Sequence, residues 1–137
     1  MRLLRRALLA LAISSFAAAG LAAEFDWAPA SEESVIEVLT SDPDGDLRET
    51  PVWIVVIDGS GYVRTTDSKW LANIRRGSAV RVRVRNVESA MVAREVSDAE
   101  LAKRVEAAFK AKYGTLQRMM SLFRMREPVV LQLIPRE

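Results

Sequence analysis

The residues best suited to chemistry in this 137-residue chain lie where a predicted strand meets a predicted helix. Thr65 and Thr66 end the strand, Ser68 is a typical helix cap, and Lys69 falls in the first turn of the helix. Hydroxyl groups, backbone amides at a helix start and an ammonium group together favour a phosphate or another anion. The junction therefore indicates an anion site. Many strand–helix junctions share the pattern, so it does not identify the ligand.

The chain contains no cysteine and no histidine, which narrows the chemistry that it can perform. The lack of cysteine excludes disulfides, thiol nucleophiles, thiolate zinc sites and iron–sulfur clusters. The lack of histidine excludes a Ser-His-Asp triad, histidine metal ligation and a histidine-ligated haem. The remaining candidates are carboxylate, Lys, Arg, Tyr, Ser and Thr side chains, or a bound cofactor. The composition alone therefore names no reaction.

An acidic motif, Asp42-Pro43-Asp44-Gly45-Asp46, resembles the start of a calcium-binding loop. Calcium loops of this type need a bidentate Glu six residues after the glycine. That position is Pro51. The simpler interpretation is a solvated acidic turn, and no metal site is predicted.

A basic motif alternates along a predicted strand, with Arg81, Arg83 and Arg85 on one face. It is either an anion-binding ladder or a solvated strand face. Nucleic acid is not an expected partner, because no aromatic platform is interleaved with the arginines. A second stripe forms either a lid over a ligand or the packed face of a helix; it consists of Met119, Met120, Leu122, Phe123 and Met125.

Residues 1–22 are typical of an export signal, in which arginines precede an apolar stretch at 7–19. Cleavage is predicted after Ala22, and the apolar stretch is shorter than the roughly 20 residues that span a bilayer. The sequence Arg5-Arg6-Ala7-Leu8-Leu9 also resembles the twin-arginine pattern, so two export routes remain open. We predict an exported protein, periplasmic or secreted, with no stable membrane insertion after cleavage.

Removal of this leader changes the charge of the chain. The precursor has 20 Lys and Arg against 18 Asp and Glu, and three of the arginines lie in the leader. The mature chain therefore carries a net charge of −1, and the basic precursor is no argument for nucleic-acid binding. Residues 24–58 hold ten acids and one base, whereas residues 59–126 hold fifteen bases and six acids. We expect the acidic third to lie against, or opposite, the basic remainder.

Hydrophobic periodicity predicts one domain over residues 32–137, preceded by a tether at 23–31 whose Trp27 tucks into a groove of the domain. The predicted helices cover 32–39, 69–76, 99–113 and about 116–123, and the predicted strands cover 52–57, 62–66, 79–85, 89–96 and 129–133. Short antiparallel strands joined by tight turns predict an α+β fold, a small antiparallel β-barrel with peripheral helices. The run Val52–Ile57 is apolar on both faces, which predicts a homodimer.

The order of motifs between residues 47 and 76 resembles the flavin- and deazaflavin-binding split-barrel superfamily, the pyridoxamine-phosphate-oxidase-like proteins. The matching motifs are an Arg-x-Thr-Pro-x-Trp strand start at 48–53, a glycine hairpin, an Arg-Thr-Thr strand end at 64–66, and a Lys-x-x-x-Asn-Ile-Arg helix at 69–75. The sequence is most similar to the small deazaflavin-dependent nitroreductase-type group and to a related bacterial domain of unknown function. The resemblance covers about residues 36–137, and motif order carries it.

This resemblance implies a split β-barrel that binds FMN or deazaflavin and transfers hydride to a small molecule, as an oxidoreductase. The cofactor-binding positions that it implies are Arg48, Thr50, Pro51, Trp53, Thr65, Thr66, Lys69 and Asn73. Thr65, Thr66 and Lys69 would hold the phosphate, and the backbone at 50–52 would line the ring. It names no catalytic residue, and a proton would come from Tyr62, Tyr113 or water.

One segment departs from the family pattern. The deazaflavin group has a basic, Gly-rich turn before the Arg-x-Thr-Pro strand, whereas this chain has three acids in residues 41–46. Three acids at this place would repel a phosphate. The alternative is therefore a non-enzymatic exported binding module on a split-barrel scaffold that has lost its cofactor, with a small-molecule ligand or protein as its partner.

Overall fold

The computed structural model describes residues 25–122 and 128–136, with the side chains of 25–114 and 128–136. The predicted export signal at 1–22 lies outside this part of the chain. The side chains of the Met-rich stripe, expected to form either a lid over a ligand or the packed face of a helix, lie outside the described side chains. The elements are α1 (Ala28–Glu32), β1 (Ile36–Ser41), β2 (Leu47–Val52), β3 (Val55–Ile57), β4 (Ser60–Thr65), α2 (Lys69–Arg75), β5 (Val80–Val84), β6 (Val87–Glu95), α3 (Ala99–Leu122) and β7 (Val129–Pro135).

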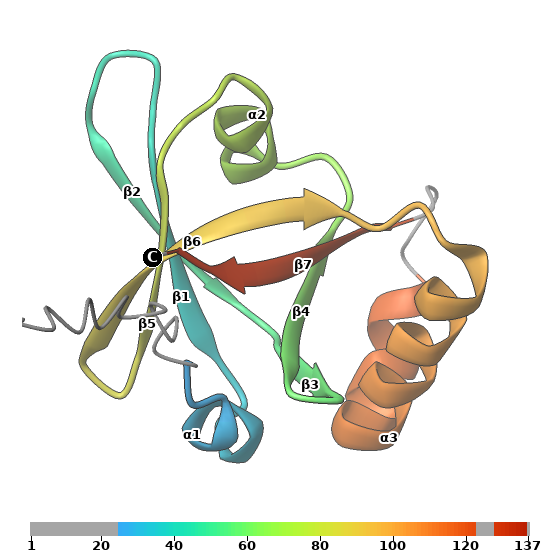
Figure 1. Cartoon of the computed structure of the whole chain (residues 1–137). Coiled ribbons are helices and arrows are strands. Elements are labelled where there is room, and N and C mark those ends of the chain that lie inside the picture. The colour runs from blue at the N-terminus through green and yellow to red at the C-terminus, as the bar shows by residue number, and fades with distance from the viewer. Residues whose placement is uncertain (1–24, 123–127, 137) are drawn as a thin grey trace, which may run out of the picture.

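The seven strands form one antiparallel sheet in the order β2-β1-β5-β6-β7-β4-β3. Strands β2 and β3 are the two edges of this sheet, yet only Trp53 and Ile54 separate them in the chain. The sheet must therefore curl until its edges approach one another, which produces the half-open barrel in Figure 1. The predicted α+β barrel with peripheral helices is confirmed.

Alternate residues of the strands point into the barrel, as the period of two in a strand requires. In β5, Val80, Val82 and Val84 are buried while the arginines between them are more exposed, as the alternation predicts. The inner core also includes Trp70 and Leu71 from α2, which therefore plugs the barrel. Ser68 caps α2, because its Oγ accepts a hydrogen bond of 3.2 Å from the Leu71 amide.

The N-terminal segment belongs to the same core. Trp27 is only 4% exposed, so the prediction that it tucks into the domain is confirmed. Its ring lies directly on β4 at Gly61, where an added Cβ would stand 2.6 Å from the ring. Glycine is required at this position because the indole occupies the space of a side chain.

Helix α3 covers the outside of β3 and forms a second apolar cluster there. Val105 and Phe109 are fully buried between the helix and the sheet. The sequence predicted one helix that stops at Gly114 and a further helix at about 116–123. In the structure, Gly114 has non-helical angles of φ 55° and ψ −123°, and α3 consists of two helical segments joined at this kink, of which the second is described to Leu122.

Two predicted elements are wrong. The helix expected at 32–39 is instead strand β1 preceded by the short helix α1. Residues Ile36, Val38 and Thr40 are β-branched and buried on one face, which favours a strand over the helical stripe read from the same sequence.

The continuous strand expected at 52–57 is broken at Trp53 and Ile54, because β2 pairs with β1 whereas β3 pairs with β4. Val52, Ile54 and Val55 are buried within one chain. Their apolar surface is thus no evidence for the predicted homodimer, which stays a prediction.

Candidate functional site

A cavity of about 440 Å³ lies between α2 and the β1–β2 connection, and we call it the α2 cavity. Its lining residues are Asp42, Pro43, Asp44, Arg48, Lys69, Ala72, Asn73 and Arg76. Three predicted cofactor-binding residues, Arg48, Lys69 and Asn73, therefore meet at one cavity. Three cationic and two acidic side chains surround it, which gives a small excess of positive charge.

The helix period explains this arrangement. Lys69, Ala72, Asn73 and Arg76 follow the spacing i, i+3, i+4 and i+7, so they share one face of α2 and the turn that ends it. Sequence reasoning missed Arg76, although this spacing from Lys69 and Asn73 would have found it.

Asn73 is the buried, hydrogen-bonded residue of the cavity lining. It is only 1% exposed, and its Nδ2 donates to Thr40 Oγ1 at 3.0 Å and to Asp42 Oδ1 at 2.9 Å. Its Oδ1 accepts a hydrogen bond from Arg76. A buried amide is costly unless its donors and acceptor are paired, so these contacts anchor α2 on β1.

Asp42 and Arg48 form a two-pronged ion pair across the cavity. Arg48 Nε donates to Asp42 Oδ1 at 2.7 Å, and its second nitrogen donates to Oδ2 at 2.9 Å. The Arg48 and Asn73 hydrogen bonds hold the pKa of the Asp42 carboxyl below its usual value. The sequence indicated that the acidic turn would repel a phosphate; the structure shows that Asp42 is bound by two of the predicted cofactor-binding residues, Arg48 and Asn73.

The other predicted cofactor-binding residues lie outside this lining. Thr50 and Pro51 are on the edge strand β2, with Thr50 on the same face as Arg48 and Pro51 exposed on the other. Thr65 ends β4 and Thr66 follows it, both half-buried in the connection to α2. Trp53 stacks on Tyr113, with ring centroids 4.2 Å apart and an interplanar angle of 5°.

Tyr113, one of the proposed proton donors, hydrogen-bonds to the backbone of the β2–β3 connection. Its hydroxyl accepts a hydrogen bond from the Ile54 amide at 2.9 Å and lies within donating distance of the carbonyls of Ser34 and Ile54. Burial raises the pKa of this hydroxyl. Lys112 Nζ donates to the Ile54 carbonyl at 2.7 Å. Both side chains satisfy backbone groups that the strand break leaves without a ladder partner.

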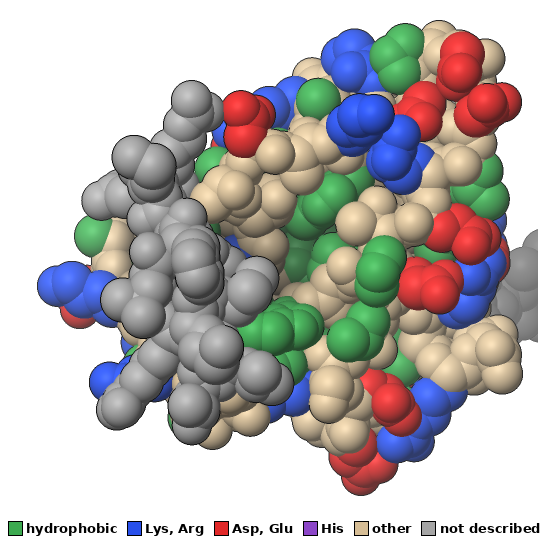
Figure 2. All heavy atoms as spheres, turned by 180° about the vertical axis from the view of Figure 1, so that it is seen from behind, with side chains coloured by type: hydrophobic (Ala, Val, Ile, Leu, Met, Phe, Trp, Pro, Cys, Tyr) green, Lys and Arg blue, Asp and Glu red, His purple; other side chains and the backbone are tan. Residues whose placement is uncertain are grey.

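The basic strand face is paired with acids, most of them from the N-terminal third and one, Glu88, from β6. Arg83 contacts Glu37, Glu49 and Glu88, and Arg85 contacts Glu32 and Glu33. The face seen in Figure 2 likewise shows acidic and basic side chains next to one another. The acidic third therefore lies against the basic remainder, and these arginines are not a free anion ladder.

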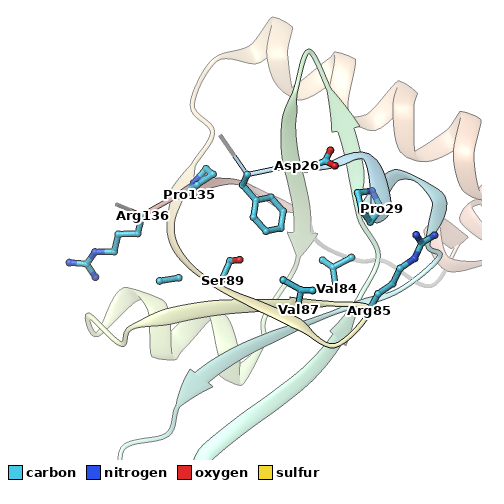
Figure 3. Close-up of a pocket in the computed structure, with 10 residues that line it drawn as sticks. Asp26, Pro29, Val84, Arg85, Val87, Ser89, Pro135 and Arg136 are labelled. Atoms are coloured by element: carbon cyan, nitrogen blue, oxygen red, sulfur yellow. The ribbon is translucent and has the colours of Figure 1, made fainter. Parts of the chain in front are cut away.

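A second hollow lies under the N-terminal segment, between it and the β5–β6 hairpin, with a volume of about 610 Å³. Figure 3 shows Pro29, Val84, Val87 and Ser89 around this hollow, with Asp26, Arg85 and Arg136 at its margins. Phe25 also belongs to its lining. We call it the N-terminal pocket. Its lining is mainly apolar, in contrast to the α2 cavity.

Residues 25–122 and 128–136 include no helix that is both long enough and apolar enough to cross a membrane. Within the same part of the chain, no three or more Asp and Glu side chains gather in a way that could hold a metal ion.

The sequence of this chain matches a known bacterial protein family. A family model described as an uncharacterized protein conserved in bacteria, DUF2255, matches residues 28–130. The chain belongs to this family. No curated protein matches it.

Solved structures share the fold at low sequence identity. A conserved hypothetical protein, Rv2991 from Mycobacterium tuberculosis, is 24% identical with a TM-score of 0.63, covering 78% of this chain and 76% of that one. The haem storage protein HutZ from Vibrio cholerae is 16% identical with a TM-score of 0.64, covering 80% and 86%. A FAD-binding protein from Mesorhizobium loti is 14% identical with a TM-score of 0.56, covering 79% and 85%.

Further matches include proteins described as putative pyridoxamine 5′-phosphate oxidases. The DUF2255 chain therefore has the split-barrel fold of the pyridoxamine-phosphate-oxidase-like superfamily, as the motif order predicted. At these identities the likeness shows the fold.

Proposed function

We propose that this DUF2255 protein binds a flavin-type cofactor, FMN or deazaflavin, with the cofactor phosphate in the α2 cavity. The observation that carries the proposal is the convergence of Arg48, Lys69, Asn73 and Arg76 on one cavity. Split-barrel neighbours that are described as FAD-binding or as putative pyridoxamine 5′-phosphate oxidases support the choice of a flavin. A bound flavin would supply hydride transfer, and the protein would hold and orient it.

The exposed cations of the cavity can contact a phosphate group of the cofactor. Lys69 and Arg76 are exposed cations on one side of α2, and they would make the first contacts with the anion. Arg48 and Asn73 lie behind them and are held by Asp42. Among the described strands, β2 pairs with β1 alone, so backbone groups on its other side can pair with the polar edge of a flat ring.

The test is a titration of the protein with FMN and with deazaflavin, followed by flavin fluorescence, for the wild type and Lys69→Ala. A charge-assisted contact contributes about 1.5–3 kcal/mol. Its loss should therefore weaken binding by about 10- to 150-fold. Lys110→Ala is the control, because it removes the same charge from an exposed position of α3.

Equal affinity of the wild type and Lys69→Ala would remove Lys69 from the site. A wild type that binds neither cofactor would overturn the proposal and favour the alternative, a cofactor-free binding module. The occupation of Arg48 and Asn73 by Asp42 favours that alternative, and the apolar N-terminal pocket offers it a separate ligand site. The predicted homodimer is retained as part of the proposal, and sedimentation equilibrium distinguishes it from a monomer.

A further inference from the structure

Asp42 lies in the place where an oxyanion would be recognised. Its two carboxylate oxygens accept two parallel hydrogen bonds from the Arg48 guanidinium, at 2.7 and 2.9 Å. Asn73 Nδ2 adds a third bond to Oδ1 at 2.9 Å, from a side chain that is 1% exposed. A bidentate arginine supported by a buried amide is an arrangement that selects carboxylate or phosphate groups.

We propose that Asp42 is the specificity-determining residue of the α2 cavity, because its carboxylate occupies the Arg48–Asn73 oxyanion position and thereby disfavours a doubly charged phosphate. The inference rests on the proposed function, because it assumes that the ligand binds in this cavity. The wild-type cavity then offers Lys69 and Arg76 to a ligand, and a singly charged group such as a phosphodiester matches its small excess of positive charge.

The chain geometry makes Asp42 a strong competitor. It lies six residues before Arg48, on a turn in which the Gly45 amide donates to the Asp42 carbonyl and the Asp42 amide donates to the Asp46 carbonyl, both at 2.9 Å. Groups joined by a short linker meet at effective concentrations in roughly the millimolar range. A free phosphate of similar affinity for these donors must exceed that concentration to displace the carboxylate. The lowered pKa of Asp42 keeps it ionised at neutral pH.

Asp44 provides a matched comparison within the same cavity. It carries the same charge and lines the same space. Within the described residues, however, its carboxylate accepts a single, local hydrogen bond, from the Asp46 amide at 3.0 Å. Asp42→Ser and Asp44→Ser therefore remove one negative charge each, whereas only the first releases Arg48 and Asn73. Serine also suits both turn positions.

The experiment titrates the wild type and both variants with inorganic phosphate and with FMN, and compares FMN with riboflavin 4′,5′-cyclic phosphate, its singly charged diester. Asp42→Ser should bind phosphate and FMN at least about tenfold more tightly than the wild type. It should also shift the preference from the diester toward FMN. Asp44→Ser should show a clearly smaller change. Asp42→Ser combined with Arg48→Gln should lose the gain.

Equal gains for Asp42→Ser and Asp44→Ser would overturn the inference, since general electrostatics would then explain the effect. If the wild type binds FMN and Asp42→Ser binds it no better, the inference fails while the proposed function stands. If Asp42→Ser binds phosphate while the wild type binds no flavin, the inference stands and the proposed function fails. If no protein binds either probe, both fail.

A measurement on the wild type alone covers the case in which Asp42→Ser does not fold. The side-chain amide signals of Asn73 in NMR spectra should not move in phosphate below about the millimolar range. Movement at micromolar phosphate would show that the Arg48–Asn73 position is open, and would overturn the inference.

Discussion

Replacing Tyr113 by phenylalanine tests how the barrel is closed between its two edge strands. The Tyr113 hydroxyl accepts a hydrogen bond of 2.9 Å from the amide of Ile54, a fully buried residue at the β2–β3 connection. Phenylalanine keeps the ring that stacks on Trp53 and removes only the hydroxyl. The variant therefore isolates one polar contact from the surrounding packing.

The expected loss of stability depends on which groups lose their hydrogen-bond partners. The Ile54 amide is left without an acceptor, and an unsatisfied buried donor costs about 1–3 kcal/mol. The Ile54 carbonyl keeps Lys112 Nζ at 2.7 Å, so it adds little to the loss. We expect Tyr113→Phe to lower the free energy of unfolding by about 1–3 kcal/mol, with the stacking contribution of about 0.5–1.5 kcal/mol retained.

The assay is urea unfolding of the wild type and variants, followed by tryptophan fluorescence and circular dichroism. Tyr62→Phe is the matched control: its ring is also buried, and no described residue hydrogen-bonds to its hydroxyl, so the change should cost less than about 0.5 kcal/mol. Equal stabilities of Tyr113→Phe and the wild type would refute the reasoning. So would a loss as large as that of Tyr113→Leu, which also removes the stacking.

The raised pKa of Tyr113 adds a second readout. Because the folded state favours the neutral hydroxyl, this contribution is fully present below the unfolded pKa of about 10. It is lost as the pH rises through the higher folded value. The wild type should therefore lose stability in strongly alkaline solution, and Tyr113→Phe should lack this part of the loss.

Two further predictions follow from the packing and the ion pairs. Gly61→Ala should destabilise the fold by about 1–2 kcal/mol in urea unfolding, because overpacking against Trp27 outweighs the strand preference for alanine over glycine. In a Trp27→Ala background, the same change should be neutral or stabilising. Hydrogen bonding and ion pairing lower the pKa values of Asp42, Glu88 and Glu95, which stabilises the fold above about pH 4. This stabilisation is lost as the pH falls through the folded pKa values, so the thermal unfolding temperature should drop in this range. An unfolding temperature that stays unchanged between about pH 5 and pH 2 would contradict the ion-pair assignment.

The sequence was most informative where local and tertiary preferences agree. The alternation of valine and arginine at 80–84 and the Ser68 cap of α2 each determined an element correctly. The helix predicted at 32–39 failed because the same short window fits both patterns: Val35, Ile36 and Leu39 form a helical stripe, whereas Ile36, Val38 and Thr40 form one face of a strand. Their pairing with β2 and β5 decided the outcome, and no local pattern contains that information.

The candidate site was likewise predicted in part from the sequence. Arg48, Lys69 and Asn73 were predicted together from motif order, and the structure gathers them at the α2 cavity. The partnership of Asp42 with Arg48 and Asn73 was not foreseen, because it depends on how a turn folds back over a helix from a distant part of the chain. The sequence showed the charges but not which of them neutralise one another.

The position of β7 determines how this protein must be assembled. The strand is the last of the seven to be synthesised, yet it lies inside the sheet, hydrogen-bonded to β6 on one side and β4 on the other. Without residues 129–135, the native pairings of the other described strands give two separate ribbons, β2-β1-β5-β6 and β4-β3, in which β6 and β4 each lack the partner that β7 supplies. Completion of the fold is therefore a late event that joins these ribbons. Proteolytic trimming that removes β7 would divide the sheet in two instead of shortening one of its edges.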